Sequence, residues 1–135
     1  METALFALLG VIFGACLQYY FTRHLENEKH LRDLRTQSYT DYLNSVAKVA
    51  KLKGDSAARE ILFAEIADAK CRISLYASPA VIEAFAIFEK EGATLISSKE
   101  KTAFIEMITR MRADSGGKGK ANPDDIAALI LGYRH

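Results

Sequence analysis

The sequence predicts an all-α protein, in which a single N-terminal transmembrane helix continues into an antiparallel cytoplasmic bundle of four to five helices. An uninterrupted apolar run opens the chain, and apolar side chains then recur at helical spacing through most of the remainder. No stretch alternates polar and apolar residues in the manner of a half-buried strand. Proline occurs only twice in 135 residues, so long helices meet few breakers.

The first element is the apolar segment from Ala4 to Phe21. It contains no charged residue, and Gln18 is its one strongly polar side chain. At about 1.5 Å per residue, a helix of this length approximately spans the ~30 Å hydrocarbon core of a bilayer. We therefore expect a transmembrane anchor over residues 1–21 and a cytoplasmic domain over residues 22–135.

Two other interpretations of this segment compete with a retained anchor. A cleaved secretory signal needs a basic N-terminal region, whereas this chain has Glu2 there, and aromatic residues close the run. The small residues before Cys16 suit a lipoprotein signal, but the same basic region is missing. A buried helix of a soluble protein is disfavoured, because the segment is apolar around nearly its whole circumference.

Positive charge flanks only one end of the anchor. The basic residues that follow it are Arg23, Lys29, Arg32 and Arg35, and none precedes it. The positive-inside rule then predicts a single-pass protein of the cell inner membrane, with its N-terminus outside and its C-terminal domain in the cytoplasm. Tyr19, Tyr20 and Arg23 suit the membrane interface, and membrane lipid is the first expected partner.

Small or polar residues form one stripe along the anchor. They are Thr3, Ala7, Gly10, Gly14 and Gln18, at steps of four, three, four and four. Gly10 and Gly14 make a G-x-x-x-G pair, which lets two helix backbones approach closely in lipid, and Gln18 can hydrogen-bond across such a contact. We expect this face either to pack anchors together in a homo-oligomer or to line a narrow pore, although glycine is also common in transmembrane helices generally.

The cytoplasmic part begins with a long juxtamembrane helix over residues 22–53, which continues the anchor without a breaker and ends at Gly54. Its apolar repeat is Leu31, Leu34, Tyr39, Tyr42, Val46 and Val49. Three to four shorter helices fill residues 55–135. We expect them to begin at Asp55 or Ser56, at Ser78-Pro79, at Ser97 or Ser98, and at Asn122-Pro123.

Each shorter helix carries one apolar stripe that we expect to face the core. The four stripes are Leu62, Ile66, Ala69, Ile73 and Tyr76; Val81, Phe85 and Phe88; Phe104, Ile108 and Met111; and Ile126, Leu129, Ile130 and Tyr133. Gly92 ends the third helix, and residues 114–121 form a flexible loop. Ile82 and Ile87 widen the apolar face of the third helix, and we expect them to meet core on a second side.

Composition argues against several functional classes. The net charge is +1, so no excess of basic charge favours a nucleic-acid partner. Cys16 and Cys71 match no metal-ligand spacing, and we expect no metal and no cofactor. The glycine- and lysine-rich segment 116–120 follows a predicted helix and lacks Walker spacing, so it is interpreted as a solvated basic loop.

Arg23 and His30 are the candidate catalytic residues of an alternative interpretation. Their spacing resembles the R-x4-6-H signature of HEPN domains, which are helical bundles that include many RNases. In active members two such motifs meet at a dimer interface and cut RNA without metal; arginine would stabilise phosphate charge while histidine moves a proton. Some HEPN-like proteins sit in membranes, including a CRISPR-associated accessory type that forms an oligomeric pore, so the resemblance also implies a role in defence. Arg23 is equally a residue that the positive-inside rule demands.

Three functions follow from these expectations. The first, which we favour, is a non-enzymatic inner-membrane protein that self-assembles through its anchor and juxtamembrane helix, as a scaffold or as a pore-forming effector in stress or defence. The second is a membrane-anchored HEPN-like RNase that uses Arg23 and His30. The third is a scaffold that recruits a cytoplasmic protein partner, with the region around Ile82, Ile87 and Phe88 as its docking surface.

Overall fold

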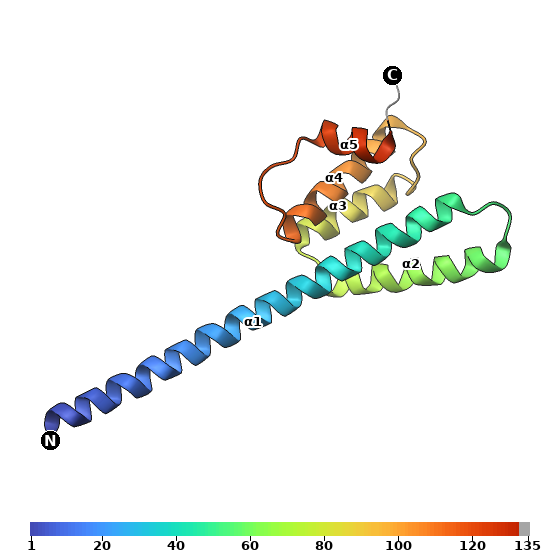
Figure 1. Ribbon diagram of the computed structural model, residues 1–135. Helices are drawn as coiled ribbons and strands as arrows, with labels where there is room; N and C mark the ends of the chain where they lie inside the picture. Colours follow the sequence, from blue (N-terminus) through green and yellow to red (C-terminus); the bar gives the residue numbers. More distant parts are fainter. Residues whose placement is uncertain (133–135) are drawn as a thin grey trace. The chain divides into compact units, whose positions relative to one another are not determined.

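The structure is a computed structural model that describes residues 1–132, and every regular element in that range is an α-helix. Figure 1 shows the five helices in chain order. They are α1 (Glu2–Lys51), α2 (Ser56–Tyr76), α3 (Pro79–Lys90), α4 (Ser98–Asp114) and α5 (Pro123–Leu131). The chain forms two compact units, Met1–Leu31 and the part from Arg32 onward. The all-helical class expected from the sequence is confirmed.

Helix α1 forms the whole first unit and then enters the second. Its N-terminal part is long and apolar enough, by length and composition, to cross a membrane. The helix ends at Lys51, where the Leu52 amide donates to the Val49 carbonyl oxygen at 3.2 Å. Gly54 has the left-handed conformation expected of it (φ +79°), but it lies in the loop beyond the helix and does not cap it. The predicted end at residue 53 is therefore two residues too late.

The starts of α2, α4 and α5 are fixed by the side chains that the sequence indicated. Asp55 accepts hydrogen bonds from two amides of the first turn of α2, and Asn122 accepts one from Asp124. At α4 the Ser97 hydroxyl and Glu100 form a reciprocal capping box. The Glu100 carboxylate also accepts from the Thr94 hydroxyl at 2.6 Å, and this bond and the two backbone bonds lower its pKa.

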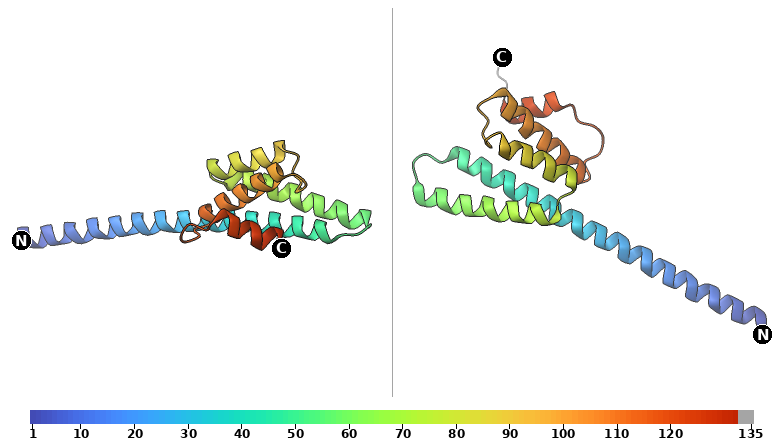
Figure 2. Two further views of the ribbon diagram at one scale, coloured as in Figure 1. Left: turned by 90° about the horizontal axis from the view of Figure 1, so that it is seen from above. Right: turned by 180° about the vertical axis from the view of Figure 1, so that it is seen from behind.

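The core of the second unit is built around two aromatic pairs. Tyr42 of α1 meets Phe85 of α3 edge-on, with ring centroids 4.8 Å apart, and Phe88 of α3 lies 5.2 Å from Phe104 of α4. Helices α3 and α4 lie side by side in all views, as Figures 1 and 2 show. The predicted inward residues that prove buried are Tyr39, Tyr42, Leu62, Ala69, Ile73, Val81, Phe85, Phe88, Phe104 and Met111. Those that prove half-buried are Leu34, Val46, Val49, Ile66, Tyr76, Ile108 and Ile126.

Polar contacts join α2 to the part of α1 that lies in the second unit. Arg72 Nη1 of α2 lies 2.8 Å from Asp41 Oδ2 of α1. Further along, the Ser45 hydroxyl donates to Glu65 at 3.2 Å. These contacts hold α1 and α2 next to each other, which places the buried face of α2 against the core.

Several residues expected in the core are exposed. On α5, Leu129 and Ile130 are 85% and 42% exposed, because the helix packs through the predicted Ile126 together with Ala127 and Leu131. The pattern of a nine-residue helix permits more than one inward face, and the packing on α4 selects this one. Leu31 is also exposed, and Tyr133 lies outside the described residues.

The expectation for the third helix is also corrected. Ile82 and Ile87 are 42% and 46% exposed, so they do not meet core on a second side. The buried face of α3 is the narrower stripe of Val81, Ala84, Phe85 and Phe88. The two isoleucines consequently lie on the solvent-facing side of this helix.

Candidate functional site

The small-residue stripe lies on the exposed surface of α1. All five of its members, Thr3, Ala7, Gly10, Gly14 and Gln18, are exposed within the first unit. A Cβ atom added to Gly10 or Gly14 would meet nothing within 4 Å in the described part of the chain. The backbone at both positions is therefore open to close approach by another helix, which is the geometry that a G-x-x-x-G contact needs.

Aromatic and basic side chains follow the apolar part of α1. Tyr19 and Tyr20 are 68% and 67% exposed. The ring of Tyr20 stacks on that of His24, with centroids 6.5 Å apart and the planes 4° from parallel. Arg23, between them in sequence, is exposed as well. This order of aromatic and then basic groups is typical of a membrane–water interface.

Arg23 and His30 share one face of α1, since seven residues are close to two helical turns. Both side chains are exposed, and their Cα atoms are separated along the helix axis by about 10 Å. The nearby His24 has a carboxylate partner on the same helix, since its Nε2 lies 3.2 Å from Glu28 Oε1. Within one chain, Arg23 and His30 face the same side of α1 but are too far apart to act on one group. A compact catalytic site built from them would require a second copy of the chain.

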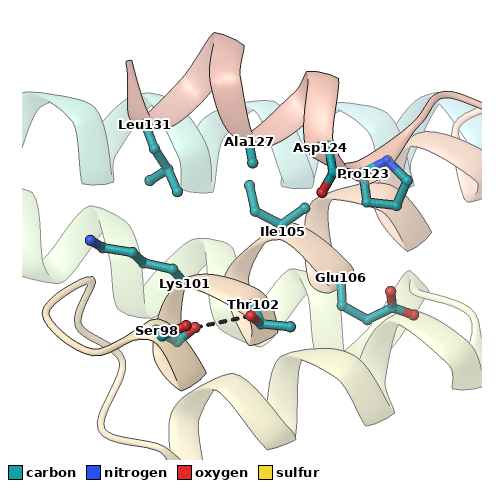
Figure 3. A pocket seen from close by; sticks show the side chains of 9 residues that line it. All are labelled: Ser98, Lys101, Thr102, Ile105, Glu106, Pro123, Asp124, Ala127 and Leu131. Atoms are coloured by element: carbon teal, nitrogen blue, oxygen red, sulfur yellow. Dashed lines mark hydrogen bonds between the residues drawn. The ribbon is translucent and has the colours of Figure 1, made fainter. Parts of the chain in front are cut away.

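A groove with a volume of about 300 Å³ lies between α4 and α5. Figure 3 shows Ile105 of α4 facing Ala127 and Leu131 of α5, with Lys101 and Asp124 at the rim. The Thr102 hydroxyl donates to the Ser98 carbonyl oxygen at 2.9 Å, so it serves the helix itself. The apolar floor explains why the groove holds α5 in place.

Two polar side chains of the groove, Thr102 and Glu106, have partners on α4 itself. Glu106, its one carboxylate on α4, is paired with Arg110 at 2.7 Å. None of the described residues that line the groove is a histidine. Within residues 1–132, no group of three or more His, Cys, Asp or Glu side chains has the arrangement of a metal site.

A polar cluster joins α1 to the rest of the second unit, and sequence analysis did not foresee it. The Tyr39 hydroxyl donates to Asp114 at the end of α4, and the Ser78 amide donates to the same carboxylate oxygen at 3.4 Å. Arg35 Nη1 lies 3.5 Å from the other oxygen of Asp114, while its Nε donates to the Tyr76 carbonyl oxygen. Arg35 and Tyr39 are one helical turn apart, but nothing in the sequence connects them with Asp114.

Burial and charge keep the two core tyrosines protonated. Desolvation raises the pKa of Tyr39 above its usual value, and the hydrogen bond to Asp114 and the charge of Asp114 add to the shift. Desolvation, with the charge of Glu89, also raises the pKa of Tyr42. Both folded-state pKa values are raised, so keeping these two tyrosines protonated contributes to the stability of the folded state. That contribution is complete below the ordinary tyrosine pKa of about 10 and is lost as the pH rises through the folded-state values.

Comparison with known proteins found no matching family model, no matching curated protein and no matching solved structure. The candidate sites therefore stand on their own geometry.

We predict that Asp114→Ala lowers the free energy of unfolding by about 2–3 kcal/mol, because it leaves the buried Tyr39 hydroxyl and the half-buried Arg35 without their shared acceptor. Asp33→Ala removes the same group from an exposed position of α1 and is expected to change stability by less than about 0.5 kcal/mol. Denaturant unfolding of the full chain in detergent, followed by circular dichroism, measures both. Equal losses in the two variants would show that the cluster contributes nothing specific.

Proposed function

We propose that this chain is a single-pass inner-membrane protein, with its N-terminus outside and an antiparallel helical bundle in the cytoplasm, which self-assembles and is not an enzyme. The observation that carries the proposal is the continuity of α1. One helix holds the apolar segment and then, from Arg32 onward, contributes Tyr39 and Tyr42 to the core of the second unit. Such a helix connects a membrane anchor to a folded domain without an intervening linker.

The exposed side chains of the first unit support the membrane anchor. Large apolar groups cover it on all sides; they include Phe6, Leu9, Val11 and Phe13, each more than half exposed. Soluble proteins rarely leave a continuous apolar surface of this extent in water. A lipid environment covers all of it at once, and the basic residues that follow favour a cytoplasmic position for the second unit.

Contacts within the second unit support the antiparallel bundle. Passing along α1 from Ser45 to Asp41 and Arg35, the partners on α2 are Glu65, Arg72 and the Tyr76 carbonyl. The residue number falls on one helix as it rises on the other, as in an antiparallel pair. The short connections between successive helices favour the same arrangement for the bundle as a whole.

Self-assembly is proposed through the small-residue stripe and the charged segment that follows it. Parallel anchors would pack at Gly10 and Gly14, and the glutamates and arginines of residues 22–36 would then pair between copies. Two copies make a scaffold. A larger ring has protein on all sides of its axis, which is the condition for a pore built from one helix per subunit, as the HEPN-like resemblance implies.

Two further functions rest on specific observations. An RNase of HEPN type is favoured by the shared exposed face of Arg23 and His30, which a dimer of α1 would double. A scaffold that recruits a cytoplasmic protein is favoured by the exposure of Ile82 and Ile87 on α3. The subunit count of the full-length protein in mild detergent, by multi-angle light scattering, separates the forms: five or more copies favour a pore, whereas a dimer or monomer contradicts it.

The native cysteines allow a test of topology. Cys71 is exposed on α2, so we predict that a membrane-impermeant maleimide labels it only after the cells are permeabilised. The control is Glu2→Cys in a Cys71→Ala background, which should be labelled in intact cells because the N-terminus lies outside. Labelling of Cys71 in intact cells would reverse the proposed orientation.

Bulk on the small-residue stripe should weaken assembly. We predict that Gly10→Leu or Gly14→Leu shifts the full-length protein toward monomer by at least about five-fold in dissociation constant, because a leucine side chain pushes the two backbones apart. Val11→Leu adds volume beside the stripe and should leave the distribution unchanged. Light scattering over a range of detergent concentrations gives the comparison, and identical behaviour of all three variants would place the contact elsewhere.

The RNase alternative has its own matched pair of variants. If Arg23 and His30 form a nuclease site, His30→Ala should reduce cleavage of a fluorescent RNA by at least about 100-fold, the usual contribution of a general acid or base. His24→Ala, six positions earlier and paired with Glu28, should retain cleavage. Absence of cleavage by the parent protein in its assembled state contradicts the alternative directly.

A further inference from the structure

The imidazole of His24 is held by the turns of α1 on either side of it. Tyr20, one turn earlier, stacks on the ring with centroids 6.5 Å apart and planes 4° from parallel. Glu28, one turn later, has its Oε1 atom 3.2 Å from His24 Nε2. All three residues lie in the first unit, so one helix sets their arrangement. A histidine and a carboxylate are both common ligands of zinc, and side chains four positions apart on a helix can bind one ion together.

The separation of the two donor atoms suits a zinc ion. Zinc in proteins is usually tetrahedral, with nitrogen and oxygen ligands at about 2.0–2.2 Å, so two of its ligand atoms lie about 3.3 Å from each other. The 3.2 Å between His24 Nε2 and Glu28 Oε1 is close to that value. Both side chains are more than half exposed, at 60% and 57%, so an ion and further ligands have access to them. One chain therefore supplies two of the four ligands of a tetrahedral site.

The same two residues continue the repeat of the small-residue stripe. The first four members of the stripe follow one another at steps of four, three and four, and the last of them is Gly14. The repeat then runs, at steps of three, four, three, four and three, through Leu17, Phe21, His24, Glu28 and Leu31. We call the positions from Thr3 to Leu31 at this spacing the α1 seam. Such a 3.5-residue period keeps side chains on the contact line of two helices that wind around each other in the left-handed sense.

His24 and Glu28 interrupt an otherwise apolar stretch of the α1 seam. Leu17 and Phe21 precede them, and Leu31 follows them. When two copies meet along the seam, the two Glu28 carboxylates face each other and repel. Burial of such a pair is costly unless an opposite charge compensates it. A divalent cation bound between the copies neutralises both carboxylates at once.

We propose that two copies of this chain bind one zinc ion between them, through His24 Nε2 and the Glu28 carboxylate of each copy; this inference rests on the proposed self-assembly along α1. Two neutral imidazoles and two carboxylates carry a charge of −2, which the ion matches. Within residues 1–132, one copy brings no three such ligands together, so the site is complete only with the second copy. Zinc binding thus favours the paired state over the single chain.

The other charged groups of this segment lie away from the α1 seam. Arg23 and Lys29 are each one position from a ligand residue, which is about 100° around the helix, so neither cation lies on the contact line. His30 is about 120° around the helix from His24. Glu26 is about 160° from Glu28, on the opposite side of α1. These positions provide matched controls for both ligands.

The test uses the full-length protein, purified in mild detergent without a histidine tag and freed of metal with a chelator. Zinc is added back, light scattering over a range of protein concentrations gives the subunit count, and elemental analysis gives the bound metal. We expect about one zinc ion per two chains and a dimer dissociation constant that is lower by at least about ten-fold. Magnesium, which prefers oxygen ligands in an octahedral arrangement, should have no such effect.

Four variants assign the ligands. His24→Ala and Glu28→Gln should each abolish zinc binding and the dependence of assembly on zinc. His30→Ala and Glu26→Gln change the same residue types off the α1 seam and should behave as the parent protein does. Zinc binding by His24→Ala equal to that of the parent overturns the proposal. One ion per chain, with an unchanged subunit count, also overturns it, because a single copy then forms the site.

The metal site and the self-assembly fail in different ways. A protein that stays monomeric at every concentration, with and without zinc, contradicts the proposed self-assembly. Dimers or larger assemblies that persist in chelator and take up no zinc contradict only the metal site. The contact between His24 and Glu28 is then an ion pair within α1.

Discussion

The apolar surface of α1 is the constraint on which the remaining interpretation depends. Nine leucine, isoleucine, valine and phenylalanine side chains between Leu5 and Phe21 are more than 40% exposed. At about 2 kcal/mol for each, their transfer out of water is worth on the order of 20 kcal/mol. That exceeds the 5–15 kcal/mol by which a whole domain is usually stable, so a purely aqueous location for this segment is the most costly arrangement of the chain.

The second unit has its own connection to this helix. Arg35 and Tyr39 hold Asp114 at the end of α4 and the turn between α2 and α3, which are distant in sequence. Tyr42, one turn further along α1, packs on Phe85. A rotation or shift of this part of α1 would therefore disturb three other helices.

Local signals in the sequence predicted the helices well, and tertiary choices account for the errors. Asp55, Ser97 and Asn122 marked helix starts because a capping side chain acts within its own first turn. The prediction that Leu129 and Ile130 face the core was wrong, because a short helix carries apolar residues on several sides and only packing decides which side is buried. Asp114 and Tyr39 are 75 residues apart, and no periodic pattern in the sequence predicts that they form a hydrogen bond. The stripe at Gly10 and Gly14 remains a prediction, because its expected partner is a second chain.

Two groups of positive charges lie in different parts of the sequence. Arg23 and Lys29 follow the apolar segment directly, as the positive-inside rule predicts beside a membrane span. Arg112, Lys118 and Lys120 lie some ninety positions beyond that segment. Their place beside Arg32 results from the packing of α4 and of Gly116 and Gly117 against α1. Eighty positions of sequence separate Arg32 from Arg112, so no local pattern could have predicted this grouping.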